Sequence, residues 1–403
     1  MDHRISYALY CAVIVSLGGF VFGFDAAVIS GVVGAVTVEF NLTPIQSGFV
    51  VAAPTLSGVF GTLVIGPLSD ALGRKKVLIL IAFLYLLSAV ASAFATSYMM
   101  LVTARAIGGL AFTSLMIAPM YIAEIAPARL RGKLVSINQL NIVVGLSAAY
   151  FANYFILKAS TSGADWVTGW GVDVNTWRWM LGVEIVPALI FFLGLFVIPD
   201  SPRWLTNNGR EQEARDVLAK LIPAEQIDDE IEVIKNSFDS ENGALWKRIQ
   251  GVLGPKMRLA LIVGIIVGVV QQITGINAIF FYAPTIFEQS GIGTDAAFAQ
   301  AVLVGLINVL FTLVAIALID RWGRRPLLLV GLSGIAISMA LCTYGFSQAT
   351  YELKAESIVQ IEQIEGIQQR VDTAALNSML GTVYQSDIDF KAALTETIGA
   401  DAA

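Results

Sequence analysis

The stretch D-A-L-G-R-K-K-V-L at residues 70–78 recurs, with the same aspartate, glycine and arginine, as D-R-W-G-R-R-P-L-L at residues 320–328. Each copy follows one long apolar segment and precedes another. Parallel repeats of this kind are typical of membrane proteins built from two like-oriented helical halves, with a binding site between them near the bilayer midplane. The repeat therefore predicts a two-bundle membrane fold.

The composition agrees with a membrane location. Hydrophobic residues make up 56% of the 403 residues and charged residues only 14%, whereas soluble globular domains carry about 25% charged residues. Apolar segments recur along the chain, each near the length of about 20 residues that crosses a bilayer as a helix. The predicted spans are 7–36, 46–67, 77–98, 99–123, 134–157, 177–198, 257–287, 296–319 and 326–347. The sequence thus predicts an all-α, multi-pass protein of the cell membrane.

Two polar segments accompany the spans. The segment 199–256 contains E-Q-E-A-R-D-V-L-A-K-L (211–221), whose helical periodicity predicts short amphipathic helices at the membrane surface. Lysine and arginine gather in this segment and after spans two, four and eight. Because basic loops stay on the cytoplasmic side, we expect the N-terminus and this segment to be cytoplasmic. The tail 348–403 should then lie outside, as a solvated and helical segment.

The repeat also suggests how the chain divides. We expect a first bundle of six spans (1–198), a cytoplasmic linker (199–256), the first three helices of a second bundle (257–347) and an extracytoplasmic polar segment (348–403). Two like halves should contain equal numbers of spans. The second bundle is therefore incomplete, and we expect the chain to be truncated after its ninth span.

Three ionisable side chains fall well inside the predicted spans: Asp25, Arg105 and Glu184. A charge at the bilayer centre costs at least about 2.5–3.5 kcal/mol, so such residues usually face a cavity or one another. At about 1.5 Å per residue, all three lie on the outer side at similar depths. One arginine neutralises only one of two carboxylates, so the other binds a proton or stays a buried anion. The set is either a proton carrier or a static ion pair that fixes helix packing.

Polar amides form a second group inside the spans. They lie in the middle of spans seven and eight and in the inner half of span five: Gln271, Gln272, Asn277, Asn308 and Gln139. Gly275 and Pro284 weaken the helix around the first three. Carboxamides donate and accept hydrogen bonds, as sugar hydroxyls require, although isolated amides often bridge helices instead. The cluster favours a neutral, polyhydroxylated ligand. Phe22 and Tyr282 could flank it, although aromatic residues in spans more often serve packing.

Other classes of function find little support. The only histidine is His3, and the sequence shows no serine–histidine or metal-ligand constellation, which argues against an enzyme and against a metal site. No basic patch resembles those that bind nucleic acid. We expect no cofactor, and a monomer whose partners are a small neutral ligand, protons and the lipid bilayer.

Several motifs, in order and spacing, resemble those of the sugar porters of the major facilitator superfamily. They are G-F-D-A-A-V-I-S-G (23–31), G-P-L-S-D-A-L-G-R-K-K (66–76), P-M-Y-I-A-E-I-A-P-A-R-L-R-G-K (119–133), P-D-S-P-R-W-L (199–205), Q-Q-I-T-G-I-N (271–277) and D-R-W-G-R-R-P (320–326). The resemblance implies symport of a proton with a pentose or hexose by alternating access. It implies that Asp25 and Arg105 couple the proton with Glu184 nearby, and that the five amides contact the monosaccharide. Facilitators of this family have a neutral residue where Asp25 stands.

The resemblance also implies a cytoplasmic gate that joins the inner ends of the two halves when the outside is open. Its charged residues are Asp70, Arg74, Glu124, Arg131, Asp200, Arg203, Asp320 and Arg324. Membrane orientation alone explains why these loops are basic. It does not require an aspartate or a glycine at a fixed position, so the D-x-x-G-R pattern that recurs in both halves favours the interpretation as a gate. The chain departs from the family at Ala71, where many relatives carry arginine. Span four lacks one residue and some glycines, which bears on the orientation of Arg105.

Three functions stay open at this point. The first is a proton:monosaccharide symporter, and the second is a facilitator of the same fold in which the buried charges are structural. The third is a sugar sensor that binds without transporting, which the ordinary length of the linker disfavours.

Overall fold

The computed structural model describes residues 3–127, 129–239, 254–255, 257–290, 292–348, 350–355, 357–358 and 373–398. Within these ranges, nine helical segments are long and apolar enough to cross a membrane, at the positions expected from the sequence. They are His3–Gly31, Pro44–Leu72, Arg74–Ala93, Tyr98–Ile125, Arg131–Ser160, Thr176–Gly194, Arg258–Phe281, Thr294–Ile319 and Arg324–Gly345. The chain forms two compact units, Met1–Leu318 and Ile319–Ala403. The division into four parts expected from the repeat stays a prediction.

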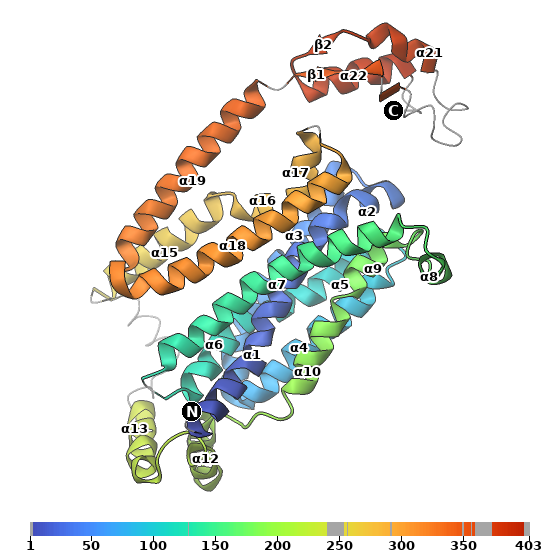
Figure 1. Ribbon diagram of the computed structural model, residues 1–403. Coiled ribbons are helices and arrows are strands. Elements are labelled where there is room, and N and C mark those ends of the chain that lie inside the picture. Colours follow the sequence, from blue (N-terminus) through green and yellow to red (C-terminus); the bar gives the residue numbers. More distant parts are fainter. Residues whose placement is uncertain are drawn as a thin grey trace. The chain divides into compact units, whose positions relative to one another are not determined.

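The first six spans pack as one bundle (Figure 1). Its elements are α1 (His3–Val28), η1 (Ile29–Gly31), α2 (Val33–Glu39), α3 (Pro44–Leu72), α4 (Arg74–Ala93), α5 (Tyr98–Ala111), α6 (Ser114–Ile125), α7 (Arg131–Ser160), α8 (Asp165–Gly169), α9 (Thr176–Gly182) and α10 (Ile185–Gly194). Helix α1 lies along α7 and also touches α6 and α10, while α5 packs against both α3 and α4. Helix α1 is therefore surrounded by other helices, and its Asp25 is buried.

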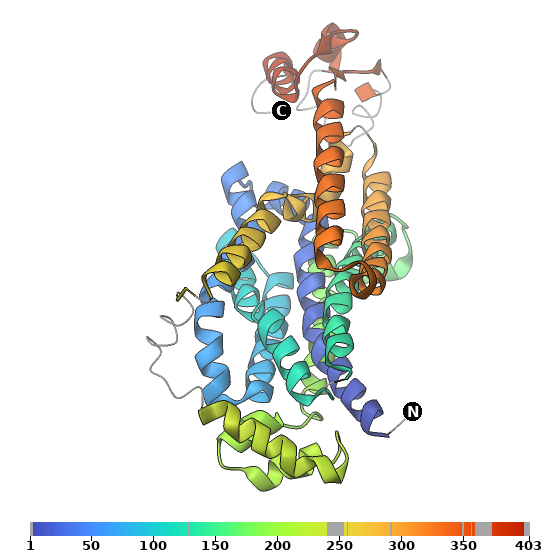
Figure 2. The ribbon, with the colours of Figure 1, turned by 90° about the vertical axis from the view of Figure 1, so that its left-hand side faces the viewer.

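The linker forms short helices at one end of this bundle. They are α11 (Pro202–Asn207), α12 (Glu211–Leu218), η2 (Ala224–Gln226) and α13 (Ile227–Asp239). In both views α12 and α13 lie beyond the end of the bundle that carries the N-terminus (Figures 1 and 2), which we call the linker end. Trp204 anchors α11 there, because its Nε1 donates a hydrogen bond to Asp70 O (3.0 Å) and its ring packs on Gly73. Gly73 has a φ of +91°, a conformation that favours glycine.

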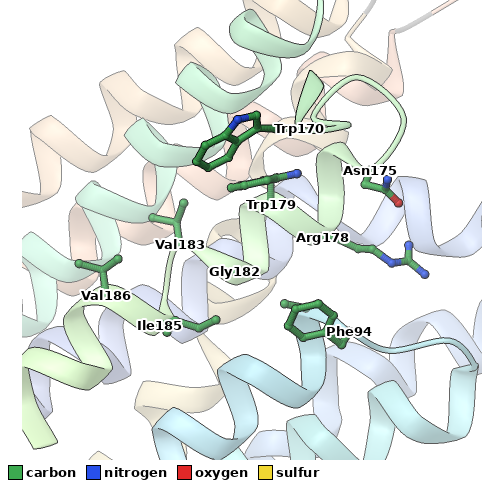
Figure 3. A pocket seen from close by; sticks show the side chains of 10 residues that line it. Phe94, Trp170, Asn175, Arg178, Trp179, Gly182, Val183, Ile185 and Val186 are labelled. Atoms are coloured by element: carbon green, nitrogen blue, oxygen red, sulfur yellow. The ribbon is translucent and has the colours of Figure 1, made fainter. Parts of the chain in front are cut away.

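Spans four, six and seven are each interrupted. Span six breaks between α9 and α10 at Val183 and Glu184, next to Gly182 and Ile185 (Figure 3). Pro187 lacks an N–H and its ring crowds the carbonyl of Val183, so the regular helical ladder fails at this point. Span seven divides into α15 (Arg258–Ile273), α16 (Ile276–Phe281) and α17 (Ala283–Gln289). Its first break is at Gly275, with a φ of +77°, where the sequence predicts a weakened helix.

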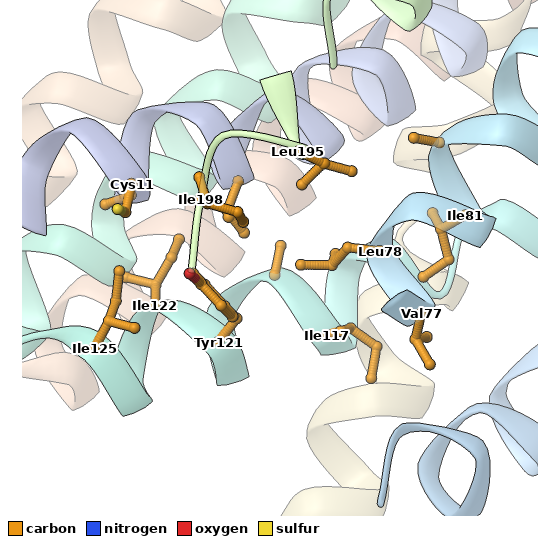
Figure 4. Close-up of a cluster of buried hydrophobic side chains, with 14 of the residues drawn as sticks. Cys11, Val77, Leu78, Ile81, Ile117, Tyr121, Ile122, Ile125, Leu195 and Ile198 are labelled. Carbon is orange, nitrogen blue, oxygen red and sulfur yellow. The ribbon is translucent and has the colours of Figure 1, made fainter. Parts of the chain in front are cut away.

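Two apolar clusters hold the bundle together. One lies towards the linker end and includes Cys11, Leu78, Tyr121 and Ile198 (Figure 4). The Tyr121 hydroxyl donates to the carbonyl of Pro199 (2.8 Å), so this buried phenol ties α6 to the segment after span six. The other cluster includes Phe24, Val28 and Leu101 of the bundle together with Ala283 and Phe298 of spans seven and eight. It therefore joins the first bundle to the beginning of the second half.

Close contact between α1 and α7 depends on two glycines. A Cβ at Gly23 would lie 1.9 Å from the carbonyl oxygen of Ile142, and a Cβ at Gly145 would lie 2.0 Å from that of Phe20. Any larger residue would therefore push the helices apart. Gly19 and Gly23 form a G-x-x-x-G pattern, which is typical of helices that approach closely in membranes.

Gly23→Ala is expected to destabilise the protein by about 1–3 kcal/mol, because the extra methyl group overpacks the contact between α1 and α7. Gly34→Ala in α2 is the matched control, since a Cβ at Gly34 meets nothing within 4 Å. Thermal unfolding of both variants in the same detergent measures the difference. Equal melting temperatures for the two variants would contradict the tight contact at Gly23.

The second unit contains the end of α18 (Thr294–Trp322), α19 (Arg324–Ser347) and a small folded tail. The tail elements are β1 (Tyr351–Glu352), α21 (Thr373–Leu376), η4 (Asn377–Met379), β2 (Val383–Tyr384) and α22 (Asp387–Ile398). Strands β1 and β2 pair antiparallel, with Tyr351 opposite Tyr384. The described part of the tail therefore contains the expected helices and, in addition, one short pair of strands. The strands and α22 pack around Leu353, Leu376 and Met379, which gives this segment its own small core.

Candidate functional site

The charged residues predicted inside the spans come together in the first bundle. Arg105 Nη1 on α5 donates a hydrogen bond to Asp25 Oδ1 on α1 at 2.6 Å, and both side chains are almost fully buried. Glu184 is also buried, with 2% of its surface exposed, and it interacts electrostatically with both residues. The predicted arrangement of two carboxylic acids and one arginine is therefore present as one cluster.

The cluster has polar atoms without partners. Asp25 Oδ2 and Arg105 Nε are buried and make no hydrogen bond with the residues that the structure describes. Buried polar groups are normally paired, so Asp25 Oδ2 is available to accept a proton, and Arg105 Nε–H is available to donate to a different acceptor. One cation cannot neutralise both acids, and the charge state of the cluster depends on one proton.

A buried tyrosine extends the cluster, and the sequence gives little sign of it. The Tyr85 hydroxyl on α4 donates to Ser114 Oγ (3.1 Å), and Ser114 Oγ donates to the carbonyl of Gly18 (3.3 Å). Tyr85 is fully buried and interacts electrostatically with Asp25 and Glu184. The intramembrane tyrosine in span three is the only signal that could have marked it.

Local structure fixes each member of the cluster. Asp25 lies two residues after Gly23, where α1 touches α7, and Asn153 Nδ2 of α7 donates to the carbonyl of Val28 (3.0 Å). Glu184 lies at the break in span six, where its N–H donates to Leu181 O at 3.3 Å in the tighter i−3 pattern. The acid on α1 is thus held by rigid packing, whereas the second acid lies on an interrupted helix.

The predicted sugar-binding amides are only partly brought together. Asn277 Nδ2 donates to Gln272 Oε1 (2.8 Å) across the break at Gly275, the only direct hydrogen bond within this set among the described residues. Gln271, Gln272, Asn277 and Gln139 are exposed, and Asn308 is half-buried. The half-buried aromatics are Phe22, which packs edge-on against Phe112 with ring centroids 4.7 Å apart, and Tyr282. The exposed amides remain available to a ligand.

Three of the predicted gate residues, Asp70, Arg74 and Glu124, form a network within the first half. Arg74 Nη1 contacts Asp70 Oδ1 (3.0 Å), and Arg74 Nε contacts Glu124 Oε1 (3.1 Å). Ser201 Oγ donates to Glu124 Oε2 (2.5 Å), which adds the segment after span six. Arg131 is exposed, while Asp200 and Arg203 are half-buried. The network therefore joins α3, α4 and α6 at the linker end.

The second-half gate residues belong to the other compact unit. Asp320 lies in the last turns of α18, and its side chain is outside the described residues. Arg324 begins α19 and is exposed. The expected pairing of the two halves through these residues stays a prediction.

Contacts between the first bundle and spans seven and eight lie at the end opposite the linker helices. Lys158 Nζ at the end of α7 contacts Asp295 Oδ2 at the start of α18 (2.5 Å), and the Tyr150 hydroxyl donates to the carbonyl of Phe280 (2.7 Å). A Cβ at Gly305 would lie 2.9 Å from Ser147 Oγ, so α18 also approaches α7 closely. The sequence reading missed these contacts, although opposite charges at the ends of spans five and eight are a visible signal.

Comparison with known proteins identifies the family. A family model described as "Sugar (and other) transporter" matches residues 11–364. The arabinose-proton symporter of Bacillus subtilis (strain 168) is 37% identical over 349 residues, which cover 86% of this chain and 72% of the relative. The D-xylose-proton symporter of Escherichia coli (strain K12) is 35% identical over 376 residues, covering 86% and 74%.

A solved structure agrees with these relatives. The major facilitator superfamily proton:xylose symporter XylE, bound to 6-bromo-6-deoxy-D-glucose, matches with a TM-score of 0.72 at 33% identity, covering 85% of this chain and 76% of that chain. This likeness confirms the predicted fold class, and the relatives confirm the resemblance drawn from the motifs. The chain belongs to the sugar transporter family and has the fold of the major facilitator superfamily.

Proposed function

We propose that this protein is a secondary active transporter that moves a pentose or hexose together with a proton by alternating access. The observation that carries the proposal is the buried pair of Asp25 and Arg105 with Glu184 beside it. Relatives at 35–37% identity that are named as proton symporters support it. The proposed activity is transport without a chemical step, so no residue is assigned a catalytic role.

The cluster couples proton binding to a change in helix packing, because Arg105 can pair with either Asp25 or Glu184. While Asp25 is ionised, Arg105 binds it at 2.6 Å. Protonation of Asp25 removes the charge that holds Arg105, and Glu184 then becomes the better partner. The three residues lie on α1, α5 and the break between α9 and α10, so the exchange shifts the packing of three spans. Arg105 bound to Asp25 and Arg105 bound to Glu184 are two states in equilibrium. A proton shifts this equilibrium only because it binds the two states with different affinity.

The sugar site is proposed between the two halves. Its residues are Gln139, Gln271, Gln272, Asn277, Asn308, Phe22 and Tyr282. The exposure of the amides and the hydrogen bond between Gln272 and Asn277 support this assignment. The left-handed Gly275 interrupts span seven beside them, which frees backbone groups for hydrogen bonding to a polar ligand.

The linker end is proposed to face the cytoplasm, with the N-terminus, because basic residues gather there. The contacts of Lys158 and Tyr150 then close the outer end. The network around Arg74 and Glu124 supports the first-half part of the inner gate. We propose that the protein acts as a monomer, with the tail after span nine outside the cell.

Asp295→Lys is expected to lower the Km for external sugar by up to about fivefold, because repulsion from Lys158 opens the outer end and raises the outward-facing population. The exposed pair should respond to ionic strength, so high salt should shrink the effect. Uptake at low external sugar measures it. The double reversal, Lys158→Glu with Asp295→Lys, should restore the original Km. An unchanged Km in the single variant would exclude a gating role for this pair.

External pH is the measurement that tests the proposed function. Cells that express the protein are suspended in weakly buffered medium, and pentoses and hexoses are added one at a time. Transient alkalinisation with one sugar establishes proton symport and identifies the substrate. Uptake of labelled sugar without a pH change would make the protein a facilitator, with Asp25 as a structural partner of Arg105.

A further inference from the structure

A cavity of about 550 Å³ lies beside the break in span six, at the end of the bundle opposite the linker helices. Its walls include Ala93 and Phe94 at the end of α4, Trp170 and Trp179, and Val183 and Val186 (Figure 3). Ligand pockets in proteins measure about 300–1,000 Å³, so the cavity is large enough for a bound molecule. Neither the charge cluster nor the proposed sugar site uses it.

The charged and amide side chains on the wall, Arg178 and Asn175, are already engaged. The Arg178 guanidinium extends away from the two tryptophan rings (Figure 3) and binds Glu39 Oε1 at 3.0 Å and the carbonyl of Ala95 at 2.9 Å. Asn175 Nδ2 donates to the carbonyl of Gly171 (3.3 Å). Apart from the indole N–H groups of Trp170 and Trp179, the rest of the lining is apolar, and apolar cavities do not hold ordered water. The wall therefore suits an apolar occupant rather than a sugar or an ion.

The cavity opens towards the lipid. Phe94, Trp170 and Val186 on its rim are 68%, 70% and 59% exposed. Below Val186 the exposed apolar surface continues along α10 through Ile190 and Leu193. Trp170 and Trp179, with ring centroids 5.8 Å apart, lie near the start of span six, where tryptophan is typical of the membrane–water interface. The cavity is thus continuous with the surface that meets acyl chains.

Glu184 lies directly behind the wall of the cavity, between lining residues. Gly182, Val183 and Ile185 line the cavity, whereas Glu184 between them is buried against Asp25 and Arg105. The segment has no regular helical bond at Glu184, whose N–H reaches only Leu181 O in the i−3 pattern. Short tightened segments inside helices often mark hinges. A molecule that packs against Gly182–Ile185 from the cavity can therefore shift Glu184 on the opposite side of this segment.

We propose that this cavity binds one acyl chain of an outer-leaflet phospholipid, and that the bound chain packs against the segment Gly182–Ile185 and positions Glu184. The second part rests on the proposed function, because it assigns Glu184 to proton coupling. The first part concerns binding alone, with the outer leaflet assigned from the proposed orientation. An acyl chain makes dispersion contacts with the walls of an apolar space of this size, and it is the apolar molecule that the bilayer supplies there.

Binding is tested with phosphatidylcholine that carries a dibrominated acyl chain, in nanodiscs that contain the full chain. Bromine quenches tryptophan, and the signal of Trp179 is obtained by subtracting that of Trp179→Phe. Gly182→Leu fills the cavity, since a Cβ at Gly182 meets only the Cβ of Ala93 at 3.7 Å. Gly182→Ala fits without filling it and is the matched control. Val186→Phe, at an exposed position, fills the cavity from the rim if Gly182→Leu fails to fold.

If a lipid is held in the cavity, Trp179 should be quenched at low fractions of brominated lipid. The quenching should exceed the amount expected when lipids exchange at random around the protein. This excess should persist in Gly182→Ala and be lost in the filled variants. Equal quenching in all variants would overturn the bound chain, whatever the transport assays show. In proteoliposomes, sugar uptake at a fixed pH gradient should change about fivefold between short and long acyl chains, and the filled variants should not respond. Excess quenching without a dependence of uptake on acyl-chain length would limit the bound acyl chain to a role in packing. It would refute the proposal that the acyl chain positions Glu184.

Discussion

Asp25→Asn is expected to abolish accumulation of sugar against its gradient while leaving downhill exchange measurable. Asparagine has nearly the size of aspartate and can still accept a hydrogen bond from Arg105, but it cannot ionise. Asp25 is almost fully buried beside Arg105, so no solvent group can take over the exchange. Arg105 then binds Glu184 permanently, and the protein loses the proton-dependent change of partner. The internal sugar concentration should rise no higher than the external one.

Proteoliposomes with an imposed pH gradient measure this effect directly, because accumulation and exchange are recorded on the same preparation. Asp165→Asn is the control, since Asp165 is an exposed acid on α8 away from the cluster. It should behave like the unaltered protein. If uphill accumulation survives in Asp25→Asn, the coupling assignment is wrong and the Asp25–Arg105 pair is structural.

The spans were predictable from the sequence because the bilayer imposes a length and a composition on each helix. All nine predicted spans overlap helices of the described residues. The interruptions within the spans were harder to predict from the sequence. Gly275 was identified as a weak point of span seven, but the effect of Pro187 on span six was not. Pro54 and Pro67 lie inside the continuous helix α3, so a proline in a span does not by itself predict a break.

The charge cluster was predictable for a related reason. Intramembrane charges are costly, so Asp25, Arg105 and Glu184 had to meet one another or a cavity. Depth along the spans gave no information on which acid binds Arg105, because that depends on helix rotation. The structure selects Asp25 at 2.6 Å.

Contacts between remote segments were not predictable from local patterns. The pairing of Lys158 with Asp295 depends on how span eight docks against span five. The tryptophans near span six show the same limit. Tryptophan at the end of a span is typical of the membrane–water interface, but Trp177 is buried with 4% of its surface exposed and donates to Glu39 Oε2 (2.5 Å). Trp177 therefore serves packing, while Trp166 and Trp170 are exposed.

Arg105→Leu is expected to destabilise the protein by about 3–5 kcal/mol, because removing one partner of a buried ion pair leaves a charge without compensation. The loss should exceed that of an ordinary buried contact, since Asp25 and Glu184 both depend on this one cation. Thermal unfolding in detergent measures it. Arg178→Leu is the control, because that arginine is also paired with an acid, Glu39, but is partly exposed. Its effect on stability should be smaller.

The double variant Arg105→Leu with Asp25→Asn separates stability from coupling. Removing both charges of the pair leaves Glu184 as the one acid of the cluster, which can stay neutral by holding a proton. Most of the stability lost in Arg105→Leu should therefore return, since replacing a whole buried ion pair by neutral groups is often close to neutral. Uphill transport should not return, because neither the proton site at Asp25 nor its movable partner remains. Recovery of accumulation together with stability would show that the pair only holds the helices in place.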